Sequence, residues 1–390
     1  MMLNVDTVRA DTVGVERTIH FNNAGSSLPP TPVVDAMVDY LRAEQVSGGY
    51  ETVADNLEQL DDVYTATATY LGCESDEVAF VAGAGDGWWR AFSAIDLAPG
   101  DRILASHSEY QANAFGFMQA ADRGVSLEVV PNDEDGLIDV DALVDMLDER
   151  VKLVSLTHIG MANGAIQRAG EVGRAVADHQ AIYLLDSCQA AGQLPLDVDD
   201  LGCDFLVYTG RKWMRGPRGT GILYARNSVL DKLGTQPFID GRSAHWLDAG
   251  GYSLEPGARR FEYGEQHFSG KVGLGVATRY MLDVGVDAIT ERTQALGHML
   301  RAGLEELPQV EVHDEGVLRG GAVCFTVRGT ASIDNGVLLR EQGLQISVPG
   351  RRNSQYDIGR RGIDAVYRAA PHYFNTEDEV ERAIELIGGI

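Results

Sequence analysis

The stretch Val207-Tyr208-Thr209-Gly210-Arg211-Lys212-Trp213 decides the fold of this chain. Its first three residues complete the apolar run Phe205–Thr209, which has the length of a strand. A glycine-rich run at residues 215–221 follows it. Similar apolar runs alternate with helix-like periodic segments from about residue 76 to 226, a pattern typical of a mostly parallel sheet with crossover helices. In such sheets ligands collect at the carboxyl ends of the strands, so polar residues directly after a strand are candidate site residues.

These alternating segments predict an α/β fold with a mostly parallel seven-stranded sheet between helices. The expected strands are Val78–Ala82, Arg102–Ala105, Leu127–Pro131, Leu153–Thr157, Ile182–Asp186, Phe205–Thr209 and Gly221–Ala225. Helices are expected between them, for example at Asp139–Leu147 and Glu171–Ala177. A loop-rich stretch, Pro237–Gly270, is followed by expected helices at Val272–Val284 and Asp287–Leu307, by strands at Ala322–Val327 and Leu344–Val348, and by a final helix from Asn375-Thr376 onward.

The length of 390 residues and the 44% hydrophobic content predict a large core divided between two domains. We expect a large domain at 21–270 and a smaller α+β C-terminal domain at 271–390. An N-terminal segment, 1–20, is expected to pack on the small domain.

The net charge of −26 argues against nucleic acid or an anionic membrane as a partner, because both would be repelled. No signal-peptide pattern opens the chain, and no window holds the ~18 apolar residues of a membrane span. The cysteines are far apart and show no metal-ligand spacing: Cys73, Cys188, Cys203 and Cys324. We therefore expect reduced thiols in a cytoplasmic protein, no metal site, and a small molecule as the partner.

Lys212 stands out because the chain contains only four lysines. A lysine held between a strand end and a tight turn is partly desolvated, which lowers its pKa toward nucleophilic use. Alternatively, Lys212 is a surface residue on a basic loop.

A carboxylate at the end of another predicted strand favours the nucleophilic interpretation of Lys212 over the surface one. In Ile182-Tyr183-Leu184-Leu185-Asp186 four apolar residues deliver a carboxylate to the end of a central strand. A buried carboxylate needs a cationic partner, and a lysine Schiff base with an aspartate on the pyridinium nitrogen is the protein signature of pyridoxal phosphate. Gln189 lies close enough in sequence to reach the ring hydroxyl oxygen. The alternative for Asp186 is a cap on the next turn.

A phosphate cradle is expected at Val81-Ala82-Gly83-Ala84-Gly85-Asp86-Gly87, which runs from a strand into a helix whose first amides can bind an anion. Thr209 and Arg211 would add a hydroxyl and a cation. The same string also suits a dinucleotide site or a simple turn, although its glycine pattern is incomplete for a dinucleotide site.

Together these motifs resemble the class V aminotransferases among the fold-type I pyridoxal-phosphate enzymes, a family that includes cysteine desulfurases, selenocysteine lyases and isopenicillin N epimerase. The resemblance extends from Phe21-Asn22-Asn23-Ala24-Gly25 to Arg368 and residues 375–379. Within the family, Arg211-Lys212-Trp213 followed by Gly216-Pro217-Arg218-Gly219, with Glu109-Tyr110 and Asn113, is most similar to the ergothioneine-pathway lyase that cleaves hercynylcysteine sulfoxide.

The resemblance implies roles for individual residues. It implies that Lys212 forms the Schiff base and that Asp186 pairs with the pyridinium nitrogen. The cofactor would further be held by Gln189, by Tyr110 stacked on the ring, by Thr209, Arg211 and the amides of Ala84 and Gly85 at the phosphate, and by Ser269 of a second subunit. The substrate would be bound by Arg368 at its carboxylate and by Asn23, Ala24, Gly25 and Asn163. Alternatives are core packing for Tyr110 and a surface strand position for Arg368.

Two departures from the family pattern carry expectations of their own. Met161 stands where the family places an asparagine, and Asn163 is the expected substitute. No cysteine lies in Ser347–Asn353, the region where desulfurases carry a sulfur-accepting cysteine, and Cys324 lies in an apolar run. The sequence therefore predicts an enzyme other than a persulfide-type cysteine desulfurase.

The predicted enzyme binds a small amino acid as a Schiff base with pyridoxal phosphate and deprotonates its Cα. The favoured outcome is β-elimination at the C–S bond of a cysteine conjugate or sulfoxide. Alternatives are an aminotransferase, an epimerase, a dinucleotide-binding oxidoreductase and a non-catalytic protein that keeps the cofactor pocket. The family resemblance also implies a homodimer with the active site at the subunit interface.

Overall fold

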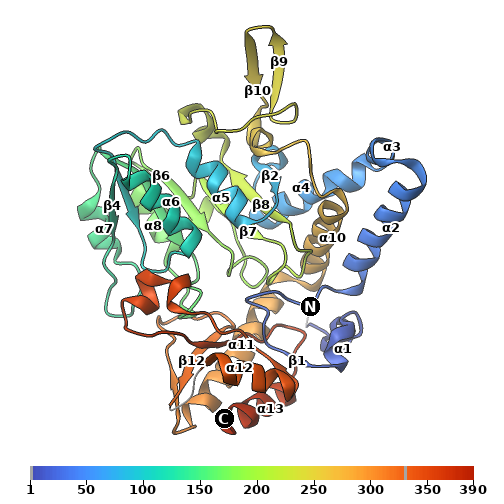
Figure 1. Ribbon diagram of the computed structural model, residues 1–390, viewed down its shortest axis with the longest axis vertical. Helices are drawn as coiled ribbons and strands as arrows, with labels where there is room; N and C mark the ends of the chain where they lie inside the picture. Colours follow the sequence, from blue (N-terminus) through green and yellow to red (C-terminus); the bar gives the residue numbers. More distant parts are fainter. Residues whose placement is uncertain (1–2, 329–331) are drawn as a thin grey trace.

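The computed structural model describes residues 3–328 and 332–390. A seven-stranded sheet lies at its centre between helices (Figure 1), in the order β2-β8-β7-β6-β5-β3-β4. The strands are β2 (Val78–Val81), β3 (Arg102–Ala105), β4 (Ser126–Val129), β5 (Val151–Thr157), β6 (Ile182–Asp186), β7 (Phe205–Thr209) and β8 (Gly221–Ala225). Neighbouring strands are parallel, except that β8 is antiparallel to β2 and β7. The predicted fold class is confirmed.

Strand β6 shows why these apolar runs form central strands. All five of its residues are buried. Tyr183 and Leu185 belong to one hydrophobic core cluster and Leu184 to another, because successive side chains of a strand point to opposite faces. The first face is covered by helices α4 (Leu57–Leu71), α7 (Val140–Met146), α8 (Ala169–Val176) and α10 (Phe268–Val284), and the second by α5 (Ala84–Ser93) and α6 (Gln111–Ala121).

The C-terminal part builds a second, smaller layer below the large sheet in Figure 1. Strands β11 (Val310–Val312), β12 (Val323–Val327) and β14 (Tyr367–Ala369) form an antiparallel sheet. Helices α11 (Val286–Glu305) and α13 (Glu377–Gly388) bury their apolar side chains against it. Its core is separate from the two cores of the large sheet.

The N-terminal segment contacts this C-terminal part. Strand β1 (Ile19–His20) pairs in parallel with β13 (Leu344–Gln345). Arg9, in α1 (Val5–Ala10), forms a 2.9 Å salt bridge with Glu379. The predicted boundary at residue 270 falls inside α10, which packs along α4 and α2 (Thr31–Ser47). The three-part division of the chain stays a prediction.

One feature of the region Pro237–Gly270 was not predicted. The expected loop contains a hairpin of β9 (Ala244–Asp248) and β10 (Gly251–Leu254), which projects from the body of the molecule (Figure 1). Both strands are largely exposed along their length, so they lack the alternation of apolar and polar residues that reveals a half-buried strand. The remaining helices are α3 (Gly49–Asp55), α9 (Val198–Leu201) and α12 (Ser332–Glu341).

Candidate active site

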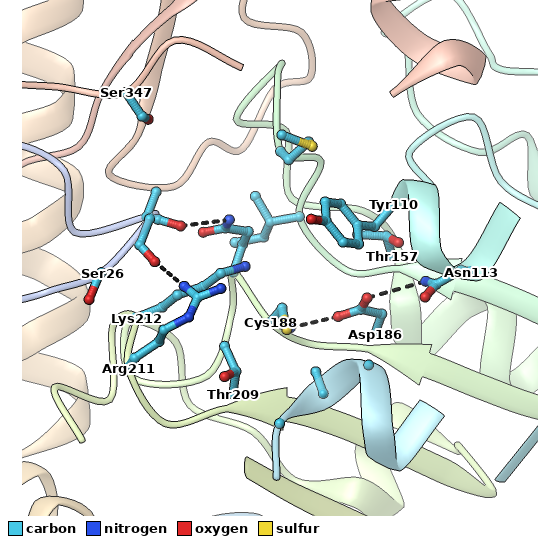
Figure 2. Close-up of a pocket in the computed structure, with 18 of the residues that line it drawn as sticks. Ser26, Tyr110, Asn113, Thr157, Asp186, Cys188, Thr209, Arg211, Lys212 and Ser347 are labelled. Atoms are coloured by element: carbon cyan, nitrogen blue, oxygen red, sulfur yellow. Dashed lines mark hydrogen bonds between the residues drawn. The ribbon is translucent and has the colours of Figure 1, made fainter. Parts of the chain in front are cut away.

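A cavity of about 640 Å³ opens at the carboxyl ends of the central strands. Most of the residues predicted for the site line it: Lys212, Asp186, Gln189, Tyr110, Ala84, Gly85, Thr209, Arg211, Arg368, Ala24 and Gly25. They come from both ends of the chain and from its middle. Figure 2 shows Lys212 and Arg211 on one side of the cavity and Tyr110, Asp186 and Asn113 on the other.

Lys212 lies in a turn that backbone hydrogen bonds fix at several points. The amide of Gly210 donates to Thr220, that of Gly216 to Gly210, and that of Arg215 to Lys212 itself, at 2.9, 2.8 and 2.9 Å. Burial lowers the pKa of the Lys212 amine, while Cys188 and Asp186 act in the opposite direction. A lowered pKa leaves more of the amine unprotonated, which is the nucleophilic form.

The carboxylate of Asp186 is held in place from two sides. One oxygen accepts from the Cys188 amide at 3.0 Å and the other from Nδ2 of Asn113 at 3.2 Å (Figure 2). The residue is only 4% exposed, and no salt bridge to it is found among residues 3–328 and 332–390. A buried carboxylate with two neutral donors and no salt bridge fits a ligand that brings a protonated ring nitrogen.

The N-terminus of α5 provides the expected anion cradle. Gly83 precedes it with φ of 153°, a conformation that residues with a side chain rarely adopt. The first amides of a helix have no acceptor within the helix, so those of Ala84 and Gly85 are suited to a phosphate. Asp86, which also lines the cavity, accepts from the Ala82 amide at 3.0 Å and forms a 2.8 Å salt bridge with Arg90. Its negative charge is therefore balanced within the chain.

Two further predicted residues lie beside this cradle. Thr209 lines the cavity and donates its hydroxyl to the Thr220 carbonyl at 3.3 Å. Arg211 donates to the carbonyl of Gly25, which ties the lysine turn to the N-terminal segment (Figure 2). Its guanidinium adds a fixed positive charge to the cavity wall.

Arg368 comes to the cavity from β14 of the C-terminal part and is 6% exposed, so it is not a surface strand residue. Its Nε donates to the hydroxyl of Ser347 at 3.1 Å and its Nη1 to the carbonyl of Met161 at 3.1 Å. The guanidinium is thus oriented before any ligand binds. A planar, fixed guanidinium is suited to paired hydrogen bonds with a carboxylate.

The side chains expected around the cofactor ring also line the cavity. Tyr110 directly precedes α6 and is 38% exposed, which excludes simple core packing. Gln189 donates to the Ala24 carbonyl at 3.1 Å and accepts from the indole of Trp213 at 2.8 Å. Its predicted contact with a ring oxygen stays a prediction.

Three predicted residues do not line the cavity. Asn163 turns away from it, accepting from the Ala165 amide and donating to Glu315, and Met161 occupies the wall instead. Asn23 is fully buried and uses its amide to bind the carbonyls of His20 and Ala370. Other groups of the chain occupy both side chains, and the predicted substrate contacts of Asn23 and Asn163 stay predictions. Ser269 is buried in the first turn of α10, and its role in a second subunit stays a prediction.

Several lining residues were missed as site residues by the sequence. They include Asn22, Ser26, Asn113, Thr157, Cys188 and Ser347. Asn113 carried a usable signal, because it lies one helical turn after Glu109 in the motif quoted above. Cys188 lies two residues after Asp186 and could have been found from that spacing. Asn22 comes from the N-terminal region and Ser347 from the C-terminal part, and no local pattern marks them.

The fold and this cavity define a class of protein. The family model of the class-V aminotransferases matches residues 19–383. The chain therefore belongs to the class-V aminotransferase family, and pyridoxal phosphate is its cofactor, as predicted. The amides at the start of α5 fit that cofactor at its phosphate, and the carboxylate of Asp186 fits it as an acceptor at its ring nitrogen.

Individual relatives refine this assignment. The chain is 27% identical to a probable cysteine desulfurase of Methanothermobacter thermautotrophicus, with all of both chains covered. It is 29% identical to a probable cysteine desulfurase of Halobacterium salinarum, over 99% of this chain and 96% of the relative. The apo structure of the cysteine desulfurase from Thermococcus onnurineus NA1 superposes with a TM-score of 0.92 at 26% identity, covering 100% and 98% of the two chains.

These relatives overturn one expectation. The prediction that the enzyme differs from persulfide-type cysteine desulfurases was wrong as an exclusion, because full-length relatives bear that name. That exclusion rested on the lack of a cysteine in Ser347–Asn353 and on the apolar run around Cys324. Cys188 lines the cavity itself, although burial, and then the Asp186 charge, raise the pKa of its thiol to about 12. The closer likeness to the hercynylcysteine sulfoxide lyase stays a prediction.

Three further observations concern the rest of the described chain. Among residues 3–328 and 332–390, no helix is long and apolar enough to cross a membrane. Within the same ranges, no group of three or more His, Cys, Asp or Glu side chains is placed to hold a metal ion. The cysteines Cys73, Cys188, Cys203 and Cys324 are free. The cytoplasmic location stays a prediction.

Proposed function

We propose that the chain is a pyridoxal-phosphate enzyme that cleaves the Cβ–S bond of cysteine or of a cysteine derivative. The observation that carries the proposal is the meeting of Lys212, Asp186 and Arg368 in one cavity. The names of the full-length relatives support a sulfur-containing amino acid as the substrate.

In this proposal the cofactor would be held at both of its ends. Lys212 would hold it covalently, and the carboxylate of Asp186 would pair with its protonated ring nitrogen. The amides of Ala84 and Gly85 bind the phosphate together with Thr209 and Arg211. Tyr110 covers one face of the ring, and an aromatic side chain at the cavity wall is suited to such stacking.

When bound, pyridoxal phosphate supplies an electron sink that stabilises negative charge at the substrate Cα. Arg368 binds the α-carboxylate of the substrate and so fixes its orientation relative to Lys212. The amine of Lys212, whose pKa is lowered by burial, would take the proton from the substrate Cα and hold it on Nζ. Asp186 keeps the ring nitrogen protonated by its negative charge.

The test measures sulfur release by the purified protein loaded with pyridoxal phosphate. We expect an absorbance band near ~420 nm from the lysine Schiff base, lost in Lys212→Ala and kept in the exposed-lysine control Lys232→Ala. Cysteine, cystine and cysteine sulfoxides are then assayed for released sulfur. Alanine as the co-product indicates transfer of the sulfur to a thiol, whereas pyruvate and ammonia indicate β-elimination.

Three outcomes would contradict the proposal. A conversion that requires an added 2-oxo acid and releases no sulfur would identify an aminotransferase. Inversion at Cα without sulfur release would identify an epimerase. A protein that shows no band with added pyridoxal phosphate would not be an enzyme of this kind.

We also propose that two copies of the chain associate, with the active site at their interface. Exposed apolar side chains support this: Val34, Val38 and Leu41 lie along one side of α2, and Trp246, on the projecting hairpin, is 84% exposed. Sedimentation of the holoenzyme at twice the 42.2 kDa chain mass would agree with this proposal, and sedimentation at the single-chain mass would contradict it.

A further inference from the structure

Behind Asp186 lies a second buried carboxyl group, that of Glu109. It follows β3, whereas Asp186 ends β6, and the two strands are separated in the sheet only by β5. Glu109 is 1% exposed and does not line the cavity. The binding of cofactor and substrate described above makes no use of it.

The surroundings of Glu109 contain hydrogen-bond donors but no cation. One of its oxygens accepts from the hydroxyls of Ser106 and Ser155 at 3.2 and 3.1 Å. The other accepts from Nδ2 of Asn113 at 2.9 Å and, at 3.4 Å, from the hydroxyl of Thr157. No salt bridge to Glu109 is found in the described ranges 3–328 and 332–390. Both oxygens of the Glu109 carboxyl group therefore have hydrogen-bond donors, but no ion pair balances a negative charge on this group.

Asn113 joins the two carboxyl groups. The same Nδ2 atom donates to Glu109 at 2.9 Å and to Asp186 at 3.2 Å. An amide nitrogen carries two hydrogens, so it can serve both acceptors at once. Glu109 is therefore linked to one oxygen of Asp186 through a single amide group, while the Cys188 amide holds the other oxygen.

The charge of Glu109 responds to its surroundings near neutral pH. Burial, and then the Asp186 charge, raise the pKa of Glu109 to about 7. The other titratable groups that act on it or feel it are the phenols of Tyr183, on β6, and Tyr356, whose own pKa values are raised, so both stay neutral. A positive charge placed at Asp186 would favour the ionised form of Glu109.

We propose that Glu109 is a positioning residue for the cofactor: through Asn113 it orients Asp186, and it adds a second negative charge behind the ring nitrogen. The proposal rests on the proposed binding of pyridoxal phosphate at Lys212 and Asp186. The cavity would then hold the ring nitrogen with a pair of linked carboxyl groups rather than with one. Both protonation of the ring nitrogen and cofactor affinity would depend on the pair.

The test uses the holoenzyme and cofactor labelled with ¹⁵N in the ring. Glu109→Gln keeps the shape and removes the charge, and the Ser106 and Ser155 hydroxyls can reorient to accept from the new amide. We expect the pH at which the ring nitrogen loses its proton to fall by about one unit, since a charge several ångströms away is worth on the order of 1–3 kcal/mol. The dissociation constant of pyridoxal phosphate, measured by equilibrium dialysis, should rise about tenfold.

Two further variants separate charge from bridging. Asn113→Ala removes the bridge, and we expect it to weaken cofactor binding about tenfold as well. Glu128→Gln makes the same change as Glu109→Gln on the neighbouring strand β4, where Glu128 binds Arg102, and should leave both measurements at their wild-type values.

The outcomes are distinct. A folded Glu109→Gln protein with the wild-type ¹⁵N titration would overturn this proposal alone, whatever its thermal stability. If Glu109→Gln does not fold, wild-type cofactor affinity in Asn113→Ala overturns it. A wild-type protein that binds no pyridoxal phosphate would overturn the proposed function and this proposal together.

Discussion

Two buried glutamates near the large sheet, Glu109 and Glu262, have opposite surroundings. Glu262 accepts from the Tyr64 hydroxyl at 2.7 Å and from the Phe80 amide at 2.8 Å, and it forms a 2.9 Å salt bridge with Arg242. Lys271 and Arg242 lower its pKa against the effect of burial. Glu109 has only neutral donors, and its pKa is raised to about 7.

The difference separates a carboxylate that serves the fold from one that serves a ligand. Glu262 joins β2, α4 and the base of the projecting hairpin, and the chain supplies its cations. Glu109 and Asp186 are buried and form no salt bridge within the described chain, and Asp186 lines the cavity. The positive charge that would balance them is therefore expected to come with the cofactor.

The largest expected effect is on Asp186→Asn. If this carboxylate serves the ligand, sulfur release should fall at least ~10³-fold, or about 4 kcal/mol of transition-state stabilisation. The apoprotein should be as stable as wild type to urea, because the substitution removes one of two neighbouring carboxylates. A loss of more than ~1 kcal/mol of apoprotein stability would break the comparison, since Asp186 would then serve the fold.

Glu262→Gln should have the next largest effect, and it should act on stability. It leaves Arg242 and Lys271 without their carboxylate, which should lower the free energy of unfolding by about 3 kcal/mol. That figure is at the lower end for a buried pair because Arg242 is partly exposed. Urea unfolding measures the loss, and the absorbance of bound cofactor serves as the control that should not change.

The smallest expected effect is the pH dependence of the apoprotein. The unfolded chain ionises Glu109 near its ordinary pKa of 4.5, whereas the folded apoprotein ionises it only near 7. The contribution of this group to stability is therefore fully present below about pH 4.5 and is lost as the pH rises through about 7. Between pH 5 and pH 8 wild type should lose about 2 kcal/mol relative to Glu109→Gln in urea unfolding. An equal difference in unfolding free energy between wild type and Glu109→Gln at both pH values would contradict this prediction. Glu262, whose pKa is lowered, should cause no loss of stability between pH 5 and pH 8.

Much of the fold was predictable because it depends on local patterns. Six of the seven central strands are buried along most of their length and therefore appear as apolar runs, β4 at the sheet edge being the exception, and all seven were found at or within a few residues of their predicted bounds. The final helix was predicted from Asn375-Thr376, and Thr376 caps it by accepting from the Glu379 amide. The hairpin β9–β10 was not predicted, because its strands are largely exposed and therefore lack the alternation of apolar and polar residues that marks a half-buried strand.

The site was predictable to the extent that its residues follow strand ends. Asp186 ends β6 and Lys212 lies in the turn that follows the neighbouring strand β7, so their proximity could be inferred from strand order alone. Asn163 was expected at the site but does not line the cavity, because its position in the sequence says nothing about the direction of its side chain, which Glu315 and the Ala165 amide determine. The link from Glu109 through Asn113 to Asp186 joins elements far apart in the chain.

The sequence by itself therefore determined the class of fold and the cofactor, since apolar runs mark the strands and the residues directly after them, Asp186 and Lys212, are local features of the chain. Only the tertiary structure decided which polar groups surround them. Arg368 reaches the cavity because the C-terminal part packs at the carboxyl ends of the central strands, and Glu109 comes to lie behind Asp186 because β5 alone separates their strands. Burial and the balance of charge are properties of neighbours in space, and the order of residues along the chain does not contain them.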